Sequence, residues 1–426
     1  MNRTTRTVAL LAAAAMTLAA CGRDDDEPEA DGGDAEAESI SEGPAEGTIE
    51  VWAMGTEGDN LDALTDAFLA DNPDASVEVT AVPWDGAHDR IATAIAAGET
   101  PDVSLIGTTW MGEFAETGGL DPTPEGLFEE SAFFEGPWGS TVVDGTSYGV
   151  PWYVETRVLY YRTDLAEQAG LEPPTNWDDL KAFVQGLQDA GAEHGIYLQP
   201  AQAGTWQTFM PFAWQNGAEL TDGSEYTLDS PEMVEALEYY KSYFDEGLSQ
   251  NTPFDPGGIE QNFVAGRIGS FISGPWHVGL VREAGGAGIE GNFDVVTLPG
   301  KEDGIGTSFV GGGNLAVFTD SDNRDGAWKY VQYLTEPEVQ QNWYEEITDL
   351  PSVKSAWEDG PLTEDEMVGT FGEQLEQTVA PPAVPTWEQV ASVIDSSIEQ
   401  VIRGQIDAAE AVADMQSQAT SIGTGL

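Results

Sequence analysis

The chain has 426 residues, with 76 acidic and 15 basic side chains, and its formal net charge at pH 7 is −61. This charge argues against binding to nucleic acid and against electrostatic adsorption to anionic membranes, because both require basic patches. We interpret the acidity as solvation of the surface. The length that remains after an atypical N-terminal segment indicates two domains.

The first 20 residues have the charge order and length of a secretory signal peptide. Arg3 and Arg6 precede an apolar run over residues 8–20, which is too short to span a bilayer. Cys21 follows and is the only cysteine, so an exported form of the chain would contain no disulfide. The ending Leu-Ala-Ala-Cys resembles the lipobox of bacterial lipoproteins, and this resemblance implies that Cys21 is lipidated.

Residues 21–47 contain mainly Asp, Glu, Gly, Ala, Pro and Ser. Such a segment cannot bury enough apolar surface to offset its ordering entropy, so we expect a disordered acidic tether between the lipid and the folded domain.

Beyond the tether, strand and helix patterns alternate. Residues 48–52, 77–81 and 102–106 have strand character, and apolar residues recur at helical spacing over 61–68. This order predicts an α/β fold with a parallel-type sheet, whose ligands bind at the carboxyl ends of the strands. The loops expected after the first and third of these strands supply Thr56, Glu57, Thr109 and Trp110.

The stretch from Gly149 to Asp164 combines a polar aromatic patch with a buried-type strand. Trp152, Tyr153 and Glu155 come first, and an apolar β-former run over residues 158–161 follows. Aromatic rings can cover the faces of a sugar while carboxylates accept hydrogen bonds from its hydroxyls. The alternative is that the aromatics belong to the core and that Glu155 is a solvated strand end.

Helical patterns and a further aromatic segment follow. Thr175 with Asp178 predicts one helix start, and Ser230 followed by Pro231 predicts another. Residues 204–217 are rich in aromatic and amide side chains.

A series of short segments runs through the rest of the chain: Pro101-Asp102-Val103, Tyr148 to Pro151, Tyr160-Tyr161, residues 175–180 with Trp177, residues 263–268, Gly274-Pro275-Trp276, Leu298-Pro299, Gly311 to Gly313 and residues 327–334. In these segments, and in the lipobox and tether before them, the chain resembles the extracellular solute-binding proteins of carbohydrate ABC importers, the family that includes the maltose-binding proteins. The resemblance covers residues 48–426. Arg162 departs from the family pattern, which usually has Asn or Asp after the tyrosine.

The resemblance implies a two-lobed α/β fold of the type II periplasmic-binding-protein kind, with discontinuous lobes joined by a hinge. Lobe 1 would comprise residues 48–154 plus 299–349, and lobe 2 residues 155–298 plus 350–426. A sugar, and we expect an oligosaccharide, would bind between the lobes and hold them closed. The closed protein would deliver the sugar to the permease subunits of the transporter. We expect a monomer without cofactors, anchored by its lipid outside the cytoplasmic membrane.

The resemblance also suggests which residues contact the sugar. Trp276 and Trp387 match stacking residues of the family, whereas Glu57 stands where a lysine is often found. Gly312 and Gly313 match a small-residue loop that lets the backbone approach a ligand, although these glycines could instead form a turn. The candidate ligand-binding residues are Thr56, Glu57, Thr109, Trp110, Tyr153, Glu155, Trp206, Trp276, Gly312, Gly313 and Trp387.

Catalytic and metal sites are not favoured. Residues 145–149 fit the letters of a nucleophile elbow, but Pro151 follows where a helix would have to begin. The three histidines have no pairing at metal-ligand spacing, so we predict no metal site. Because no catalytic motif has the required structural context, we also predict no enzymatic activity. The alternatives that remain are a secreted glycoside hydrolase and a binding protein for a non-sugar solute such as a polyamine.

Overall fold

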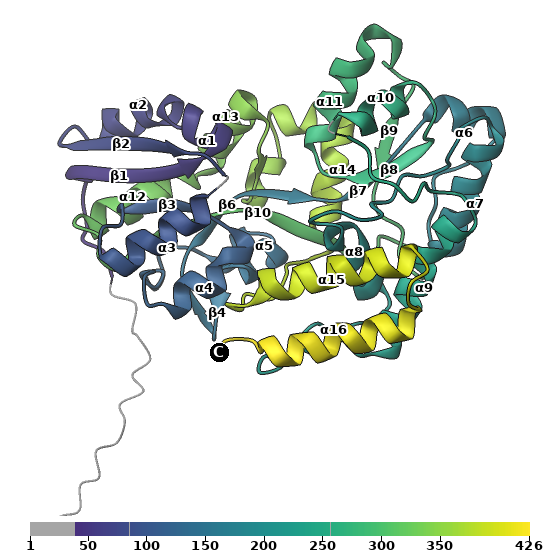
Figure 1. Cartoon of the computed structure of the whole chain (residues 1–426). Coiled ribbons are helices and arrows are strands. Elements are labelled where there is room, and N and C mark those ends of the chain that lie inside the picture. Colours follow the sequence, from purple (N-terminus) through teal and green to yellow (C-terminus); the bar gives the residue numbers. More distant parts are fainter. Residues whose placement is uncertain (1–38, 85, 256) are drawn as a thin grey trace, which may run out of the picture. The chain divides into compact units, whose positions relative to one another are not determined.

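The computed structural model describes residues 39–84, 86–255 and 257–426 (Figure 1). The predicted signal peptide, Cys21 and most of the predicted tether lie outside these residues. Within the described part of the chain, no helix combines the length and the apolar character needed to cross a membrane.

The end of the predicted tether is folded, which corrects its boundary at residue 47. Ala45 is fully buried, and its N–H donates to Asn72 Oδ1 at 2.7 Å. The N–H of Ser41 donates to Asp325 Oδ2 at 3.0 Å. Ser41 and Ala45 therefore already belong to the globular part, because their backbone N–H groups donate to side chains of that part.

The larger sheet has seven strands. Its order is β11-β6-β10-β3-β1-β2, and β12 pairs with β10. β1 pairs in parallel with β2 and β3, as the sequence predicts, whereas β10 runs antiparallel to both β3 and β6. The strands are β1 (Gly47–Met54), β2 (Ala75–Val82), β3 (Val103–Gly107), β6 (Val150–Thr156), β10 (Ser308–Val317), β11 (Leu350–Pro351) and β12 (Thr378–Val379).

A second, antiparallel sheet has the order β8-β7-β9. Its strands are β7 (Val158–Tyr161), β8 (Ser270–Ser273) and β9 (Asp294–Val296), and a small hairpin pairs β4 (Val142–Val143) with β5 (Thr146–Ser147). β7 is buried along its whole length, as its apolar run predicts. One residue, Arg157, separates β6 from β7, so the chain passes directly from the first sheet to the second.

One group of helices comes from residues 55–139 and 324–347 (Figure 1). In its core, Phe68 of α2 meets the ring of Tyr330 of α12 at 5.0 Å. The predicted loop over residues 54–60 is in fact the short helix α1. The group comprises α1 (Gly55–Asn60), α2 (Asp62–Asp71), α3 (Ala87–Ala97), η1 (Thr108–Trp110), α4 (Met111–Glu116), η2 (Glu130–Ala132), α5 (Glu135–Gly139), α12 (Arg324–Leu334) and α13 (Pro337–Ile347).

The remaining helices form a second group. α9 begins as predicted, because Ser230 Oγ accepts the N–H of Met233 at 3.1 Å and Pro231 follows. α7 begins later than predicted, with Asn176 as its N-cap. The group comprises α6 (Thr163–Ala169), α7 (Trp177–Asp189), α8 (Trp206–Gln215), α9 (Pro231–Asp245), α10 (Gly258–Val264), α11 (Trp276–Gly285), η3 (Gly286–Gly288), η4 (Lys354–Trp357), η5 (Pro361–Thr363), α14 (Glu366–Leu375), α15 (Trp387–Ile402) and α16 (Ala408–Ile422).

Arg162, the departure from the family pattern, has a structural role. Its Nη1 donates to the carbonyl oxygens of Phe263 at 2.7 Å and Val264 at 3.1 Å, at the end of α10. Its Nη2 pairs with Asp164 at 2.7 Å. The guanidinium thus satisfies carbonyls that a helix end leaves without partners.

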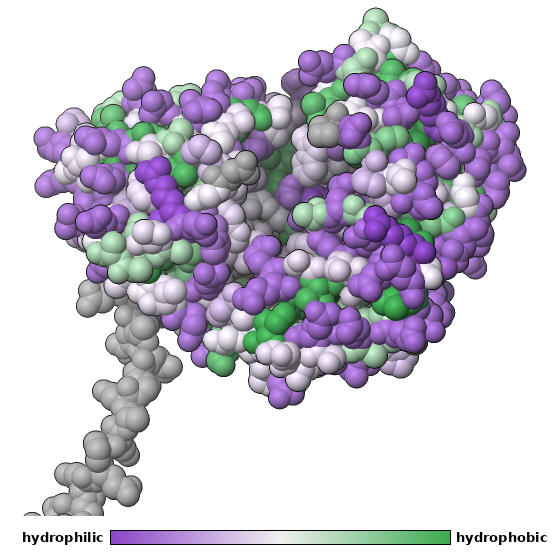
Figure 2. Space-filling model, in the orientation of Figure 1, coloured by the Kyte–Doolittle hydropathy of each residue, from purple (hydrophilic) through white to green (hydrophobic). Residues whose placement is uncertain are grey.

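The outer face seen in Figure 2 is largely hydrophilic, in keeping with the acidic composition.

Candidate functional site

Two adjoining pockets lie where strand ends and helix starts of both groups meet. The first, pocket A, has a volume of about 390 Å³, and the second, pocket B, has about 220 Å³. They share Trp84, Tyr153 and Glu155. The other residues of pocket A are Gly55, Thr56, Glu57, Val154, Pro275, Trp276, Ile347, Thr348, Asp349 and Leu350, and those of pocket B are Gly107, Thr108, Thr109, Trp110, Gln207, Phe309, Gly311 and Gly312.

β6 carries the shared wall of the two pockets. Side chains two residues apart on a strand point to the same face, so Tyr153 and Glu155 project together. The neighbouring strand, β10, presents Gly311 and Gly312 to pocket B. A Cβ on Gly312 would lie 2.2 Å from the carbonyl oxygen of Tyr153, and the φ of Gly312 is +126°. The glycine is required by the close approach of β6, and the alternative of a glycine turn is wrong because these residues are in a strand.

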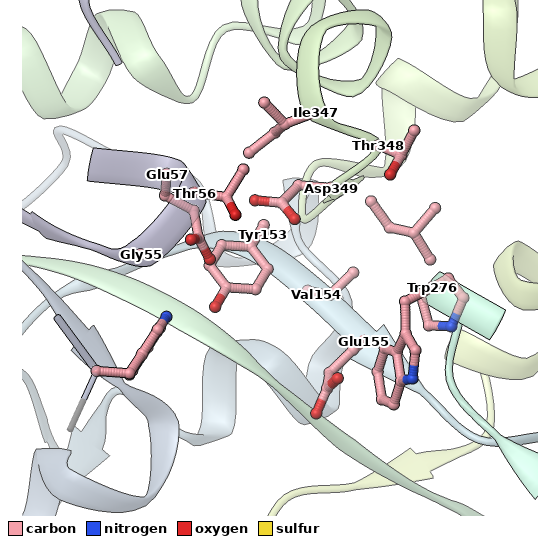
Figure 3. A pocket seen from close by; sticks show the side chains of 13 residues that line it. Gly55, Thr56, Glu57, Tyr153, Val154, Glu155, Trp276, Ile347, Thr348 and Asp349 are labelled. Carbon is pink, nitrogen blue, oxygen red and sulfur yellow. The ribbon is translucent and has the colours of Figure 1, made fainter. Parts of the chain in front are cut away.

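Acidic groups dominate the floor of pocket A. Figure 3 shows the carboxylates of Glu57 and Asp349 on one side of the pocket, beside the ring of Tyr153. Burial raises the pKa of Glu57, and burial together with the charges of Glu57 and Glu155 raises the pKa of Asp349 well above its usual value. Burial and the same three carboxylates raise the pKa of Tyr153, so its hydroxyl stays protonated as a donor. The carboxyl oxygens of Glu57, Glu155 and Asp349 outnumber this one donor, so pocket A is suited to ligands that donate hydrogen bonds.

A buried arginine supports the pocket from behind. Arg157 Nη2 donates to Gln207 Oε1 at 2.6 Å and to Glu155 Oε1 at 3.3 Å. Its guanidinium carbon lies 4.9 Å from the ring centroids of both Trp276 and Phe309. Because Arg157 touches side chains from four segments, it fixes the Glu155 carboxylate and one face of the Trp276 ring.

Two tryptophans offer exposed rings to the pockets. Trp276 is 41% exposed, which is unusual for its size, and it lines pocket A (Figure 3). Trp84 is 39% exposed, lines both pockets and meets Trp110 edge to face at 5.6 Å. Exposed aromatic faces beside carboxylates are suited to a ligand with C–H faces and a polar rim.

The structure brings eight of the predicted site residues to these pockets. Pocket A receives Thr56, Glu57, Tyr153, Glu155 and Trp276, of which Tyr153 and Glu155 also line pocket B. Pocket B adds Thr109, Trp110 and Gly312.

Three predicted residues do not reach the pockets. Trp387 is fully buried, and Trp206 is 4% exposed; their rings pack edge to face at 5.1 Å at the starts of α15 and α8. They fill the space between these helices, so neither presents a ring face to a ligand in the pockets. Gly313 is packed closely against Leu105: a Cβ added to Gly313 would lie 2.3 Å from Leu105 Cδ1. The expectation of ligand contact at these three positions is corrected accordingly.

The sequence leaves open whether Trp152 belongs to the site or to the core. The structure places it in the core, where its ring stacks on Trp343 at 5.1 Å.

Four residues of the site were missed. Trp84 is not among the predicted site residues, although it follows a predicted strand and so stands at a position where ligand residues are expected. Gln207 is adjacent in sequence to Trp206. No local sequence pattern marks Arg157 or Asp349 as a site residue. The position of Asp349 depends on Thr348, a non-glycine residue that follows α13 with a φ of +66°.

Metal ligands are not clustered in the described residues, where no three His, Cys, Asp or Glu side chains are placed to hold an ion. The buried His277 contacts Ser273 Oγ at 2.7 Å and Glu260 Oε1 at 3.2 Å beneath Trp276. Burial lowers the pKa of His277 to about 4, so the ring is neutral at pH 7.

Comparison with known proteins gives a consistent result. The family described as bacterial extracellular solute-binding protein matches residues 54–341. The sugar-binding protein MalE of Xanthomonas citri is 30% identical with a TM-score of 0.83, covering 88% of this chain and 97% of that chain. The diacetylchitobiose binding protein DasA of Streptomyces coelicolor is 31% identical over 331 residues, 74% of each protein. The GacH receptor of Streptomyces glaucescens, solved unliganded and with acarbose, is 26% identical with a TM-score of 0.74, covering 88% of this chain and 98% of that chain.

Proposed function

Because the chain belongs to the bacterial extracellular solute-binding protein family, we propose that it is the sugar-binding component of an ABC importer. The proposal rests on the lining of pocket A, which adjoins pocket B. There, the exposed rings of Trp84 and Trp276 lie beside three carboxylates, those of Glu57, Glu155 and Asp349. Rings of this kind cover the C–H faces of a pyranose, and the carboxylates accept hydrogen bonds from its hydroxyls.

An oligosaccharide suits the two pockets better than a monosaccharide. Pocket A alone falls within the range of about 300–1,000 Å³ that is usual for ligand sites. Pocket B continues past the shared residues Trp84, Tyr153 and Glu155 and has its own aromatic residue, Trp110. One sugar unit in each pocket would place the glycosidic bond beside this shared wall.

Binding would be coupled to movement of two lobes. We retain the lobes proposed from the sequence, residues 48–154 plus 299–349 and residues 155–298 plus 350–426. Support comes from the passage of the chain between the two sheets at Arg157. A ligand closes such a hinge only if it binds the closed form better, so it has to touch both lobes. Glu57 on lobe 1 and Trp276 on lobe 2 would provide such contacts.

Cys21 would anchor the mature protein to the outer face of the cytoplasmic membrane through its lipid, and the permease subunits would receive the sugar there. The protein would act as a monomer and without a cofactor. The sugar would leave chemically unchanged, since the family and its structural relatives are binding proteins.

A titration of tryptophan fluorescence tests the proposal. The chain from Gly22 onward, which lacks the cysteine, is titrated with mono- and oligosaccharides, polyamines and divalent metals, and the sugar is recovered for analysis. Saturable binding of a saccharide that is recovered intact is expected. Recovery of cleaved sugar would favour a glycoside hydrolase, and a response only to polyamines or metals would overturn the sugar assignment.

A further inference from the structure

The lining of pocket A contains acidic side chains and no basic ones. The acidic residues are Glu57, Glu155 and Asp349. Glu155 is paired with Arg157 at 3.3 Å. Among the described residues, neither Glu57 nor Asp349 forms an ion pair with a basic side chain within 4.0 Å. Among the described residues, Glu57 and Asp349 are therefore the acidic side chains of pocket A without a basic partner.

Glu57 and one carboxyl oxygen of Asp349 are withdrawn from water, which makes a negative charge on either group costly. Glu57 is only 7% exposed although it lines the pocket. Asp349 Oδ2 is buried and forms no hydrogen bond of good geometry among the described residues, although the indole of Trp343 lies beside this carboxyl and acts to lower its pKa. A buried acceptor without a partner costs free energy that a donor arriving with a ligand would recover. The two groups lie on the same side of the pocket (Figure 3), so one ligand group could reach both.

The aromatic residues of the pocket favour a cationic donor. Trp84, Tyr153 and Trp276 present rings around the same space, and the faces of aromatic rings attract cations. An alkylammonium group provides three N–H donors and one positive charge, which satisfies both carboxylates and the rings together. A divalent metal is a poorer match, because no cluster of three His, Cys, Asp or Glu side chains is present among the described residues.

We propose that pocket A selects a saccharide that carries a protonated amine, with the ammonium group between Glu57 and Asp349 and the sugar ring against Trp276. This inference rests on the proposed function, since it assumes that the ligand is a sugar, and it names the class of sugar. Neutral saccharides would donate only hydroxyl groups to the two carboxylates and would leave their charge unbalanced.

A matched ligand series tests the proposal by calorimetry. Chitobiose, cellobiose and N,N′-diacetylchitobiose share a β-1,4-linked glucose backbone and carry an amine, a hydroxyl or an acetamide at C2. Glucosamine, galactosamine and mannosamine are compared with their parent hexoses in the same way. Titrations are run at about pH 6, below the pKa of about 7.7–8.0 of an α-amino group, so that the amines are charged.

Two double variants separate the pocket from the general acidity of the chain. Glu57→Gln with Asp349→Asn removes both charges from the pocket. Glu225→Gln with Asp229→Asn removes two exposed carboxylates outside both pockets and is the matched control. All titrations use about 0.15 M salt, where exposed charges beyond about 8 Å are screened.

We expect at least one amino sugar to bind tenfold or more tightly than its hydroxyl counterpart. The pocket variant should lose most of this ratio, and the control variant should keep it. Equal or tighter binding of the neutral sugars overturns the inference and leaves the proposed function in place. Loss of the ratio in both variants also overturns it, because the attraction is then unspecific. If no saccharide binds, the proposed function fails and the inference fails with it.

Discussion

Replacing Trp276 by alanine is expected to weaken sugar binding by about 2 kcal/mol. The side chain is 41% exposed, and a tryptophan presents at most about 250 Å². The surface available to a ligand is therefore about 100 Å², which at about 25 cal/mol per Å² corresponds to about 2.5 kcal/mol if it is covered completely. Partial coverage lowers this value to about 2 kcal/mol, or a dissociation constant about thirtyfold higher.

Calorimetry with the sugar found in the fluorescence titration is the appropriate assay, because the substitution removes a fluorophore. Trp276→Phe should recover part of the affinity, since a smaller ring still covers one sugar face. Trp214→Ala is the matched control: Trp214 is partly buried and lines a different hollow. A change of less than threefold for Trp276→Ala, with the folded state intact, would remove the ring from the binding site.

Three further substitutions test the local structure through urea unfolding. The pKa of His277 falls to about 4 in the folded state from about 6.5 in the unfolded state. The unfolded state therefore takes up the proton first, and up to about 3 kcal/mol is lost as pH falls from about 6.5 to about 4. His277→Gln should lose less stability over this range. Thr348→Gly should stabilise the protein by about 1 kcal/mol, because it relieves a φ of +66°. Gly312→Ala should destabilise it by about 3 kcal/mol, since the new Cβ meets the Tyr153 carbonyl oxygen.

Each of these predictions has its own control. Equal acid sensitivity of His277→Gln and the wild type would show that the histidine does not titrate as inferred. Thr348→Ala keeps the Cβ and should gain much less than Thr348→Gly, so equal effects would contradict the strain argument. Gly279→Ala lies in α11 with no atom within 4 Å of the added Cβ and should be neutral or stabilising. A tolerated Gly312→Ala would mean that β10 can move away from β6.

The fold class and part of the site were predictable because they depend on local patterns. Strand and helix periods alternate before residue 106, and the carboxyl ends of parallel strands meet on one edge of a sheet. Thr56, Glu57, Thr109 and Trp110 follow such ends, and all four line the pockets.

The remaining part of the site depends on packing that no local pattern records. The aromatic residues at the starts of α8, α11 and α15 look alike in sequence, yet Trp206 and Trp387 are buried against each other and Trp276 is exposed. Which of them faces a ligand is decided by the crossing of the helices. Arg157 contacts side chains from four segments that meet only in the folded chain. Asp349 reaches the pocket because Thr348, which is not a glycine, has a left-handed backbone conformation.

The strand order also has a consequence for the way the chain folds during export. β10 lies between β3 and β6 and pairs with both, yet the chain leaves the larger sheet at Thr156 and returns to it only at Ser308. Until that return, β3 and β6 each have an unpaired edge of the kind that templates aggregation. Pairings between such distant segments are slow to form. A chain that emerges N-terminus first therefore has to complete the second sheet while one edge of β3 and both edges of β6 are still unpaired, because β10 and β11 come later in the chain. The pocket walls formed by β6 and β10 are therefore among the last surfaces to be assembled.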